Sequence, residues 1–168
     1  RPASGSEHHL SHYFEITGIV HDEPYFCHGI DVAYSTIVTA ALRDELLAKE
    51  WPTNQYRPSR EDYCAAVKAI YGPVAEGCIA LQDKVGLYKK DMVSIYKAKE
   101  AEIRAVLAEM PKAEEIEKML AAVGLDKAEF HKLYTDKKIA NAILYAKELK
   151  DRYTVLWLHY DLFGGEEA

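Results

Sequence analysis

Residues 28 to 49 read HGIDVAYSTIVTAALRDELLAK, and this stretch decides the fold class. Its apolar residues recur at roughly every third or fourth position, at Val32, Ile37, Ala41, Leu42, Leu46 and Leu47. Because an α-helix turns once in about 3.6 residues, this spacing lines one helix face with apolar side chains. The stretch therefore predicts a long amphipathic helix from His28 to about Lys49.

The rest of the chain repeats the helical spacing, and apolar and polar residues nowhere alternate for long with period two. A first helix is expected from a hydroxyl cap at residues 4–6 to about Thr17, and a third from a capping box at Ser59 to near Gly72. Further helices are expected over 74–87, over 92–110, over 113–123 with Gly124 as its cap, and from Thr135 or Asp136 to about Tyr153. We predict a single all-α domain over residues 1–168.

Composition narrows the class of protein. The chain has 168 residues, is 49% hydrophobic and carries a net charge of −6, with no basic patch for nucleic acid and no apolar run long enough to span a membrane. An anionic substrate would therefore need a local basic pocket. The three cysteines, Cys27, Cys64 and Cys78, form no CxxC pair, which favours a reducing cytoplasm over a secreted disulfide scaffold.

Histidines are concentrated at the beginning of the chain. Five of the seven lie within the first 28 residues, at His8, His9, His12, His21 and His28. His8 and His12 are four residues apart and share one helix face, the spacing that two imidazoles need to reach one metal ion. His9 occupies the place of the glutamate in the HExxH motif, which argues against a zinc protease. Gly29 beside His28 would permit close approach of a ligand. Solvated surface imidazoles are the alternative interpretation.

Three short stretches carry a resemblance to a known family. They are RPASGSEHHLSH over residues 1–12, CHG over 27–29 and KELKDRYTVL over 147–156. Together they resemble the sn-glycerol-1-phosphate dehydrogenases, within the superfamily of iron-dependent alcohol dehydrogenases and dehydroquinate synthases. The chain would be the C-terminal α-helical, metal- and substrate-binding domain of such an enzyme, and we expect the N-terminal α/β nucleotide-binding domain to be absent.

The resemblance implies a cytoplasmic, metal-dependent NAD(P)-linked oxidoreductase of phospholipid metabolism that interconverts dihydroxyacetone phosphate and sn-glycerol 1-phosphate, or a related polyol. It places a divalent metal, zinc first and nickel or iron as alternatives, on His8, His28 and an aspartate upstream of this chain. His12 would act as the catalytic residue near the reacting carbon. NAD(P)H would be bound mainly by the enzyme's own N-terminal domain, in a homo-oligomer without nucleic-acid or membrane partners. The isolated chain is expected to be inactive.

Two other functions remain open at this point. A dehydroquinate synthase-like lyase would share the architecture, the metal and the nucleotide. A non-catalytic helical interaction domain would leave the histidines as surface residues. The sequence contains no GxGxxG or GxxxxGKS phosphate loop, so a complete nucleotide site is not expected within this chain.

Overall fold

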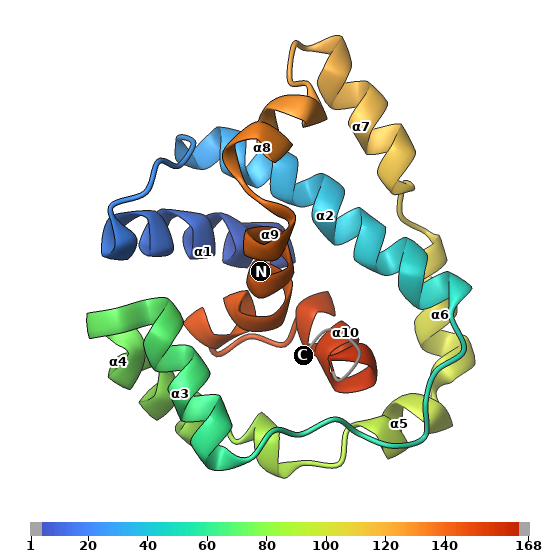
Figure 1. Ribbon diagram of the computed structural model, residues 1–168. Helices are drawn as coiled ribbons and strands as arrows, with labels where there is room; N and C mark the ends of the chain where they lie inside the picture. Colours follow the sequence, from blue (N-terminus) through green and yellow to red (C-terminus); the bar gives the residue numbers. More distant parts are fainter. Residues whose placement is uncertain (1–4, 165–168) are drawn as a thin grey trace.

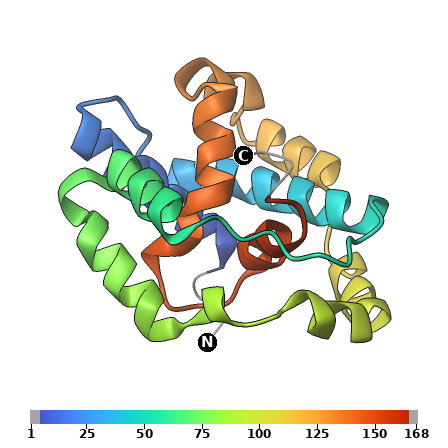
Figure 2. The same cartoon turned by 60° about the horizontal axis from the view of Figure 1, so that its bottom comes forward.

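The computed structural model describes residues 5–164 and confirms the all-α prediction, since those residues form helices and no strand. Residues 1–4, the start of the first quoted motif, and residues 165–168 lie outside the described part. In Figures 1 and 2, α9 (Asp136–Tyr145) and α10 (Val155–Phe163) occupy the middle of the molecule, and the other helices surround them. All residues of α10 from Leu156 to Phe163 are buried.

The first two helices form an antiparallel pair. α1 (Ser6–His21) is followed by a short loop and by α2 (His28–Ala48), which begins at the predicted residue. α1 ends four residues later than predicted, where Asp22 adopts a left-handed conformation with φ 54°. The predicted hydroxyl cap is wrong for Ser6, which lies inside the helix, and Ser4 is outside the described residues.

The middle of the chain is built from shorter helices than the spacing predicted. Ser59 caps α3 as expected, because its side chain accepts a hydrogen bond from the Asp62 backbone N–H. The predicted 92–110 helix is divided at Lys99, and α8, capped by Asp126, was not predicted. The elements are α3 (Arg60–Tyr71), η1 (Gly72–Val74), α4 (Ala75–Val85), η2 (Leu87–Lys89), α5 (Val93–Ala98), α6 (Glu100–Ala108), α7 (Ala113–Ala122) and α8 (Lys127–Leu133).

The predicted final helix is interrupted. α9 passes into η3 (Ala146–Leu149), residues 150–154 are not helical, and α10 then begins. Gln82 explains the interruption, because its side-chain amide donates to the carbonyl oxygens of Lys147, Glu148 and Lys150 at 3.3, 3.0 and 3.0 Å. These contacts satisfy backbone acceptors that a continuous helix would have used itself.

Contrary to the expectation from composition, one stretch, residues 60–85, is long and apolar enough to be considered as a membrane span, because an 18-residue window within it has a mean hydropathy of 1.3. This stretch is not one straight helix, because Gly72, with φ 48°, and Pro73 divide it into α3 and α4. The two helices contact each other, as the green segments of Figures 1 and 2 show. By length and composition alone, the stretch is weak support for a membrane segment.

A buried polar network lies in the interior of the helical fold. Lys147 and Glu148, both fully buried, form an ion pair at 2.6 Å, and Glu148 also accepts hydrogen bonds from the hydroxyls of Tyr63 and Tyr88. The Lys147 ammonium lies 3.6 Å from the centroid of the Tyr160 ring. Each charged group in this network therefore has partners that offset its removal from water.

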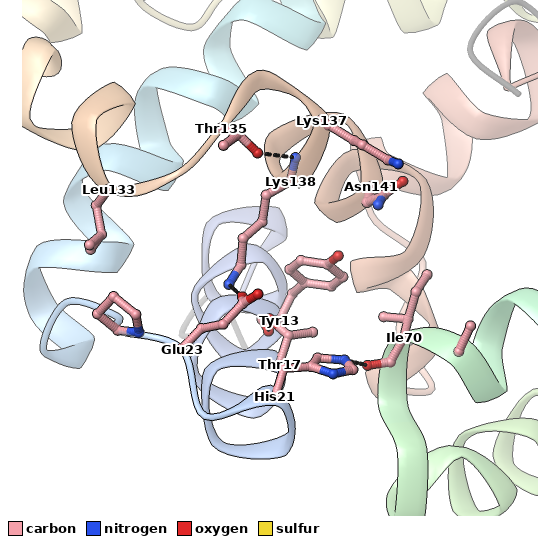
Figure 3. Close-up of a pocket in the computed structure, with 12 residues that line it drawn as sticks. Tyr13, Thr17, His21, Glu23, Ile70, Leu133, Thr135, Lys137, Lys138 and Asn141 are labelled. Carbon is pink, nitrogen blue, oxygen red and sulfur yellow. Dashed lines mark hydrogen bonds and ion pairs between the residues drawn. The ribbon is translucent and has the colours of Figure 1, made fainter.

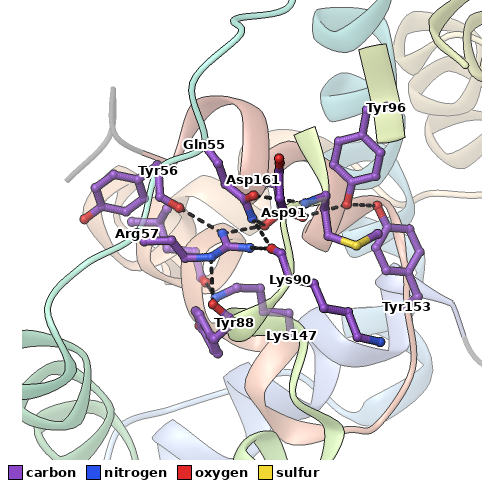
Figure 4. A network of polar contacts seen from close by, with 12 residues as sticks. Gln55, Tyr56, Arg57, Tyr88, Lys90, Asp91, Tyr96, Lys147, Tyr153 and Asp161 are labelled. Atoms are coloured by element: carbon purple, nitrogen blue, oxygen red, sulfur yellow. Dashed lines mark hydrogen bonds and ion pairs between the residues drawn. The ribbon is translucent and has the colours of Figure 1, made fainter. Parts of the chain in front are cut away.

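A second chain of polar contacts joins α10 to the surrounding loops (Figure 4). Arg57 forms an ion pair with Asp161 at 2.7 Å, and the Tyr96 hydroxyl donates to the same carboxylate at 2.6 Å. Tyr153 in turn donates to the Tyr96 hydroxyl. Since α10 carries Asp161 in the middle of the molecule, these contacts attach the C-terminal helix to the region around residue 57 and to α5.

Candidate metal centre

Three histidines meet where α1 lies against the start of α2. His8 and His12 come from α1, and His28 is the first residue of α2. The His28 ring centroid lies 5.4 Å from that of His8 and 5.2 Å from that of His12. Two imidazoles that share one tetrahedral zinc ion, with Zn–N distances of about 2.0–2.1 Å, have ring centroids roughly 5 Å apart. The spacing of these rings is therefore suitable for a shared ion.

Glu15 connects two of these histidines. One of its carboxylate oxygens accepts from Nδ1 of His12 at 3.0 Å, and the other accepts from Nδ1 of His28 at 3.1 Å. The Ser11 hydroxyl also lies 3.1 Å from Nδ1 of His28. A carboxylate that binds Nδ1–H fixes the ring orientation and leaves Nε2 as the free acceptor atom.

The donor atoms of His12, Glu15 and His28 all lie within 4.8 Å of one another, so this trio is a possible ligand set for a metal ion. The predicted ligand pair, His8 and His28, is also brought together, although the trio contains His12 in place of His8. The division of roles between His8 and His12 stays a prediction. Glu15 received no role from the sequence, but its position three residues after His12 was the signal that could have identified it.

The cluster is accessible, and the environment of His12 favours the neutral imidazole. The side chains of His8, His12 and His28 are 30, 33 and 43% exposed, so solutes can reach them. Burial, with a smaller contribution from the charge of Lys150, lowers the pKa of His12, against the effect of Glu15. A neutral imidazole is the form that binds a metal ion or accepts a proton.

The residues next to the three histidines are either accessible or buried in the interior. A Cβ placed on Gly29 would meet nothing within 4 Å, so the space beside His28 is open. Asp31 is buried and accepts a hydrogen bond from the Tyr134 hydroxyl at 2.8 Å. His9 is also fully buried, and burial together with Lys150 lowers its pKa to about 4. Asp31 and His9 therefore face the interior and not the cluster.

A cavity of about 570 Å³, lined by both polar and apolar residues, lies between α1, α3 and the start of α9 (Figure 3). Three of its polar groups already have partners, because Lys138 contacts Glu23 at 2.6 Å and His21 shares a hydrogen bond of 2.8 Å with the Ile70 carbonyl oxygen. Thr135 caps α9 at its rim. These contacts give Lys138, Glu23 and His21 structural roles.

Comparison with known proteins gives one partial match. The glycerol-1-phosphate dehydrogenase [NAD(P)+] of Bacillus subtilis (strain 168) is 31% identical to this chain over 77 residues. The matched stretch covers 46% of this chain and 18% of that protein. No protein-family model and no solved structure matches the chain. The match is a weak and partial similarity to one dehydrogenase, and it covers far less than that protein's length.

Proposed function

We propose that this chain is the helical metal- and substrate-binding domain of a metal-dependent NAD(P)-linked oxidoreductase acting on a glycerol phosphate or a related polyol. The observation that carries the proposal is the convergence of His8, His12 and His28 at the α1–α2 junction, with centroid distances of 5.4 and 5.2 Å to His28. The partial similarity to a dehydrogenase favours this reaction class over the lyase.

In this proposal His8 and His28 hold the divalent ion, zinc first and nickel or iron as alternatives, together with an aspartate from outside the chain. Imidazole nitrogens suit these ions, and the accessible positions of both rings leave room for further ligands. When bound, such an ion supplies Lewis acidity that polarises the oxygen of the reacting carbonyl or alcohol.

His12 is proposed to hold or accept the proton. Its Nδ1–H donates to Glu15, so Nε2 carries the free lone pair. Glu15 fixes the ring plane and stabilises the imidazolium that forms when Nε2 takes a proton from a substrate hydroxyl. Glu15 would thereby act as a positioning residue, while His12 contacts the substrate.

The remaining parts of the proposal lie outside this chain. NAD(P)H would be bound mainly by the enzyme's own N-terminal domain, in a homo-oligomer in the cytoplasm. The 168 residues alone should bind metal weakly and oxidise no NAD(P)H. Steady NAD(P)H oxidation by this chain with dihydroxyacetone phosphate would contradict the proposed division of the active site.

Three alanine variants test the roles in a protein that joins this chain to its nucleotide domain. His8→Ala and His28→Ala should lower metal content and activity together. His12→Ala should retain the metal and lose rate by about 10² to 10⁴-fold, the usual contribution of positioned proton transfer. Metal analysis decides between the roles, because loss of metal from His12→Ala with full metal in His8→Ala would reverse the assignment.

A further inference from the structure

A second cavity, of about 520 Å³, adjoins the histidine cluster at the beginning of α1. It lies between the N-terminal residues of α1, the middle of α2 and the loop before α10. Glu7 forms part of its wall, and the Glu7 carboxylate is 3.2 Å from Nδ1 of His8. Glu7 therefore separates this cavity from the candidate metal centre by a single side chain.

The cavity concentrates positive charge in a chain whose net charge is −6. Arg43 and Arg152 both line it, and Lys150 lies in the same loop as Arg152. The side chain of Arg43 donates to the neutral Pro111 carbonyl oxygen at 3.1 Å. Among the described residues that line the cavity, Glu7 is the one carboxylate, and it also accepts from the Gly5 backbone N–H at 2.9 Å. Two guanidinium groups thus face one carboxylate.

Two helix N-termini open into the same cavity. Gly5 and Ser6 at the start of α1, and Thr154 and Val155 at the start of α10, contribute to its wall. Neither helix is capped by a side chain of the described residues. The first N–H groups of a helix have no intrahelical acceptor, and together with the helix dipole they favour an anion.

Two buried hydroxyls on the cavity wall have no hydrogen-bond partner within residues 5–164. They belong to Thr39, which is 7% exposed, and to Thr154. A buried hydroxyl without a partner costs free energy, so its presence calls for a partner that the protein itself does not provide. Uncapped helices, arginines and these hydroxyls are all donors that one oxyanion satisfies together.

We propose that this cavity binds the phosphate group of a small phosphate monoester, with Arg43 and Arg152 as charged donors and Thr39 and Thr154 as hydroxyl donors. The identity of the ester rests on the proposed function: a polyol phosphate held here would extend past Glu7 toward His8 and the candidate metal centre. Guanidinium groups suit this ligand, because they bind phosphate oxygens in a bidentate manner.

Calorimetric titration of this chain tests the site, with inorganic phosphate, sn-glycerol 1-phosphate, glycerol and NADP⁺ as separate ligands. Arg152→Gln should weaken phosphate binding about tenfold or more, as expected for loss of one charge-assisted contact. Thr39→Val keeps the shape of the side chain and should weaken binding while leaving the fold intact. Arg60→Gln is the matched control, because Arg60 is exposed, pairs with Asp83 and is not among the described residues that line the cavity.

Absence of phosphate binding to the unaltered chain at millimolar concentration, or equal binding by Arg152→Gln, would overturn the site. A polyol phosphate is supported if the chain binds sn-glycerol 1-phosphate more strongly than inorganic phosphate and does not bind glycerol. The assignment to a polyol phosphate is overturned if NADP⁺ alone binds in a manner that depends on Arg152. Zinc affinity is measured without phosphate in a protein that joins this chain to its nucleotide domain, because this chain alone should bind metal weakly. Failure of zinc binding contradicts the proposed function, whereas failure of phosphate binding contradicts only this inference.

Discussion

Two groups of ionisable side chains in this molecule differ in their exposure to solvent. The buried network of Lys147, Glu148 and two tyrosines is closed, since the ion pair is fully buried and each charge contacts several partners. The histidine cluster of His8, His12, Glu15 and His28 is accessible, and its side chains are between 22 and 43% exposed.

The difference separates structural polar groups from those available for chemistry. A closed network lowers the free energy of the folded state only while every member is present, because removal of one partner leaves a buried charge alone. An open cluster contributes little to folding, since water can replace each lost contact. We therefore expect the same carboxylate-to-amide change to have different consequences in the two groups.

The largest effect is expected for Glu148→Gln. The change leaves the Lys147 ammonium buried without its carboxylate, and it should lower the free energy of unfolding by about 3 to 5 kcal/mol. Urea denaturation measures the loss. Glu129→Gln is the control, because Glu129 forms an exposed pair with Lys132, and its urea midpoint should not change measurably.

If Glu148→Gln does not fold, a double variant still tests the network. Lys147→Met combined with Glu148→Gln removes both charges and should recover part of the lost stability. If Glu148→Gln unfolded at the same urea concentration as the unaltered chain, the network would not be holding η3 in place.

The next effect concerns Glu15→Gln in the histidine cluster. The fold should tolerate the change, since Glu15 is partly exposed, and the urea midpoint should stay nearly constant. Metal affinity should fall by about 10 to 100-fold, the usual effect of removing a carboxylate that orients a metal-binding histidine. Zinc titration of a protein that carries both domains, in competition with a chelator, measures it.

Loss of stability without loss of zinc affinity in Glu15→Gln would reverse the comparison and make the cluster structural. The matched control is Glu23→Gln, which removes an exposed carboxylate from the loop after α1. Glu23 pairs with Lys138, away from the three histidines, so its zinc affinity should equal that of the unaltered chain.

The sequence predicted helices well where spacing and caps agree. The start of α2 at His28 and the cap of α3 at Ser59 both follow from local signals. The break between α9 and α10 did not, because it depends on Gln82, which is more than 60 residues away and binds three carbonyl groups of this segment. Local propensity contains no information on such a contact.

The candidate site was predicted only in part, again because local sequence does not determine how distant segments pack. The i,i+4 spacing of His8 and His12 follows from helix geometry alone. The approach of His28 required the packing of α1 against α2, and the resemblance to a family supplied that expectation. The cavity beside Glu7 could not be predicted, because Glu7, Arg43 and Arg152 come together only when three distant segments pack.

A smaller effect is expected at Asp31, which lies beneath the histidine cluster. Burial raises its pKa to about 7, against the Tyr134 hydrogen bond and the charge of Lys138, while Glu15 adds to the rise. Because this pKa is higher in the folded than in the unfolded chain, the folded state gains stability as the pH falls from 8 to 5. The gain should be about 2 to 3 kcal/mol.

Asp31→Asn keeps an acceptor for the Tyr134 hydroxyl but removes the titration. The variant should be the more stable protein at pH 8, and its advantage should disappear at pH 5. Urea denaturation at the two pH values measures the difference between the two proteins. An advantage of equal size at both values would show that the Asp31 carboxyl does not take up a proton in this range.

The smallest effect on stability is expected for Gly29→Ala, and it examines the open side of the histidine cluster. Gly29 is the second residue of α2, and an added Cβ meets nothing within 4 Å. Alanine favours a helix over glycine, so the free energy of unfolding should rise by about 0.5 kcal/mol. If the space beside His28 receives substrate or nucleotide, the same methyl group should lower the activity of a protein that carries both domains. Increased stability with unchanged activity would mean that nothing approaches Gly29, and it would restrict the reacting ligand to the side of His8 and Glu7.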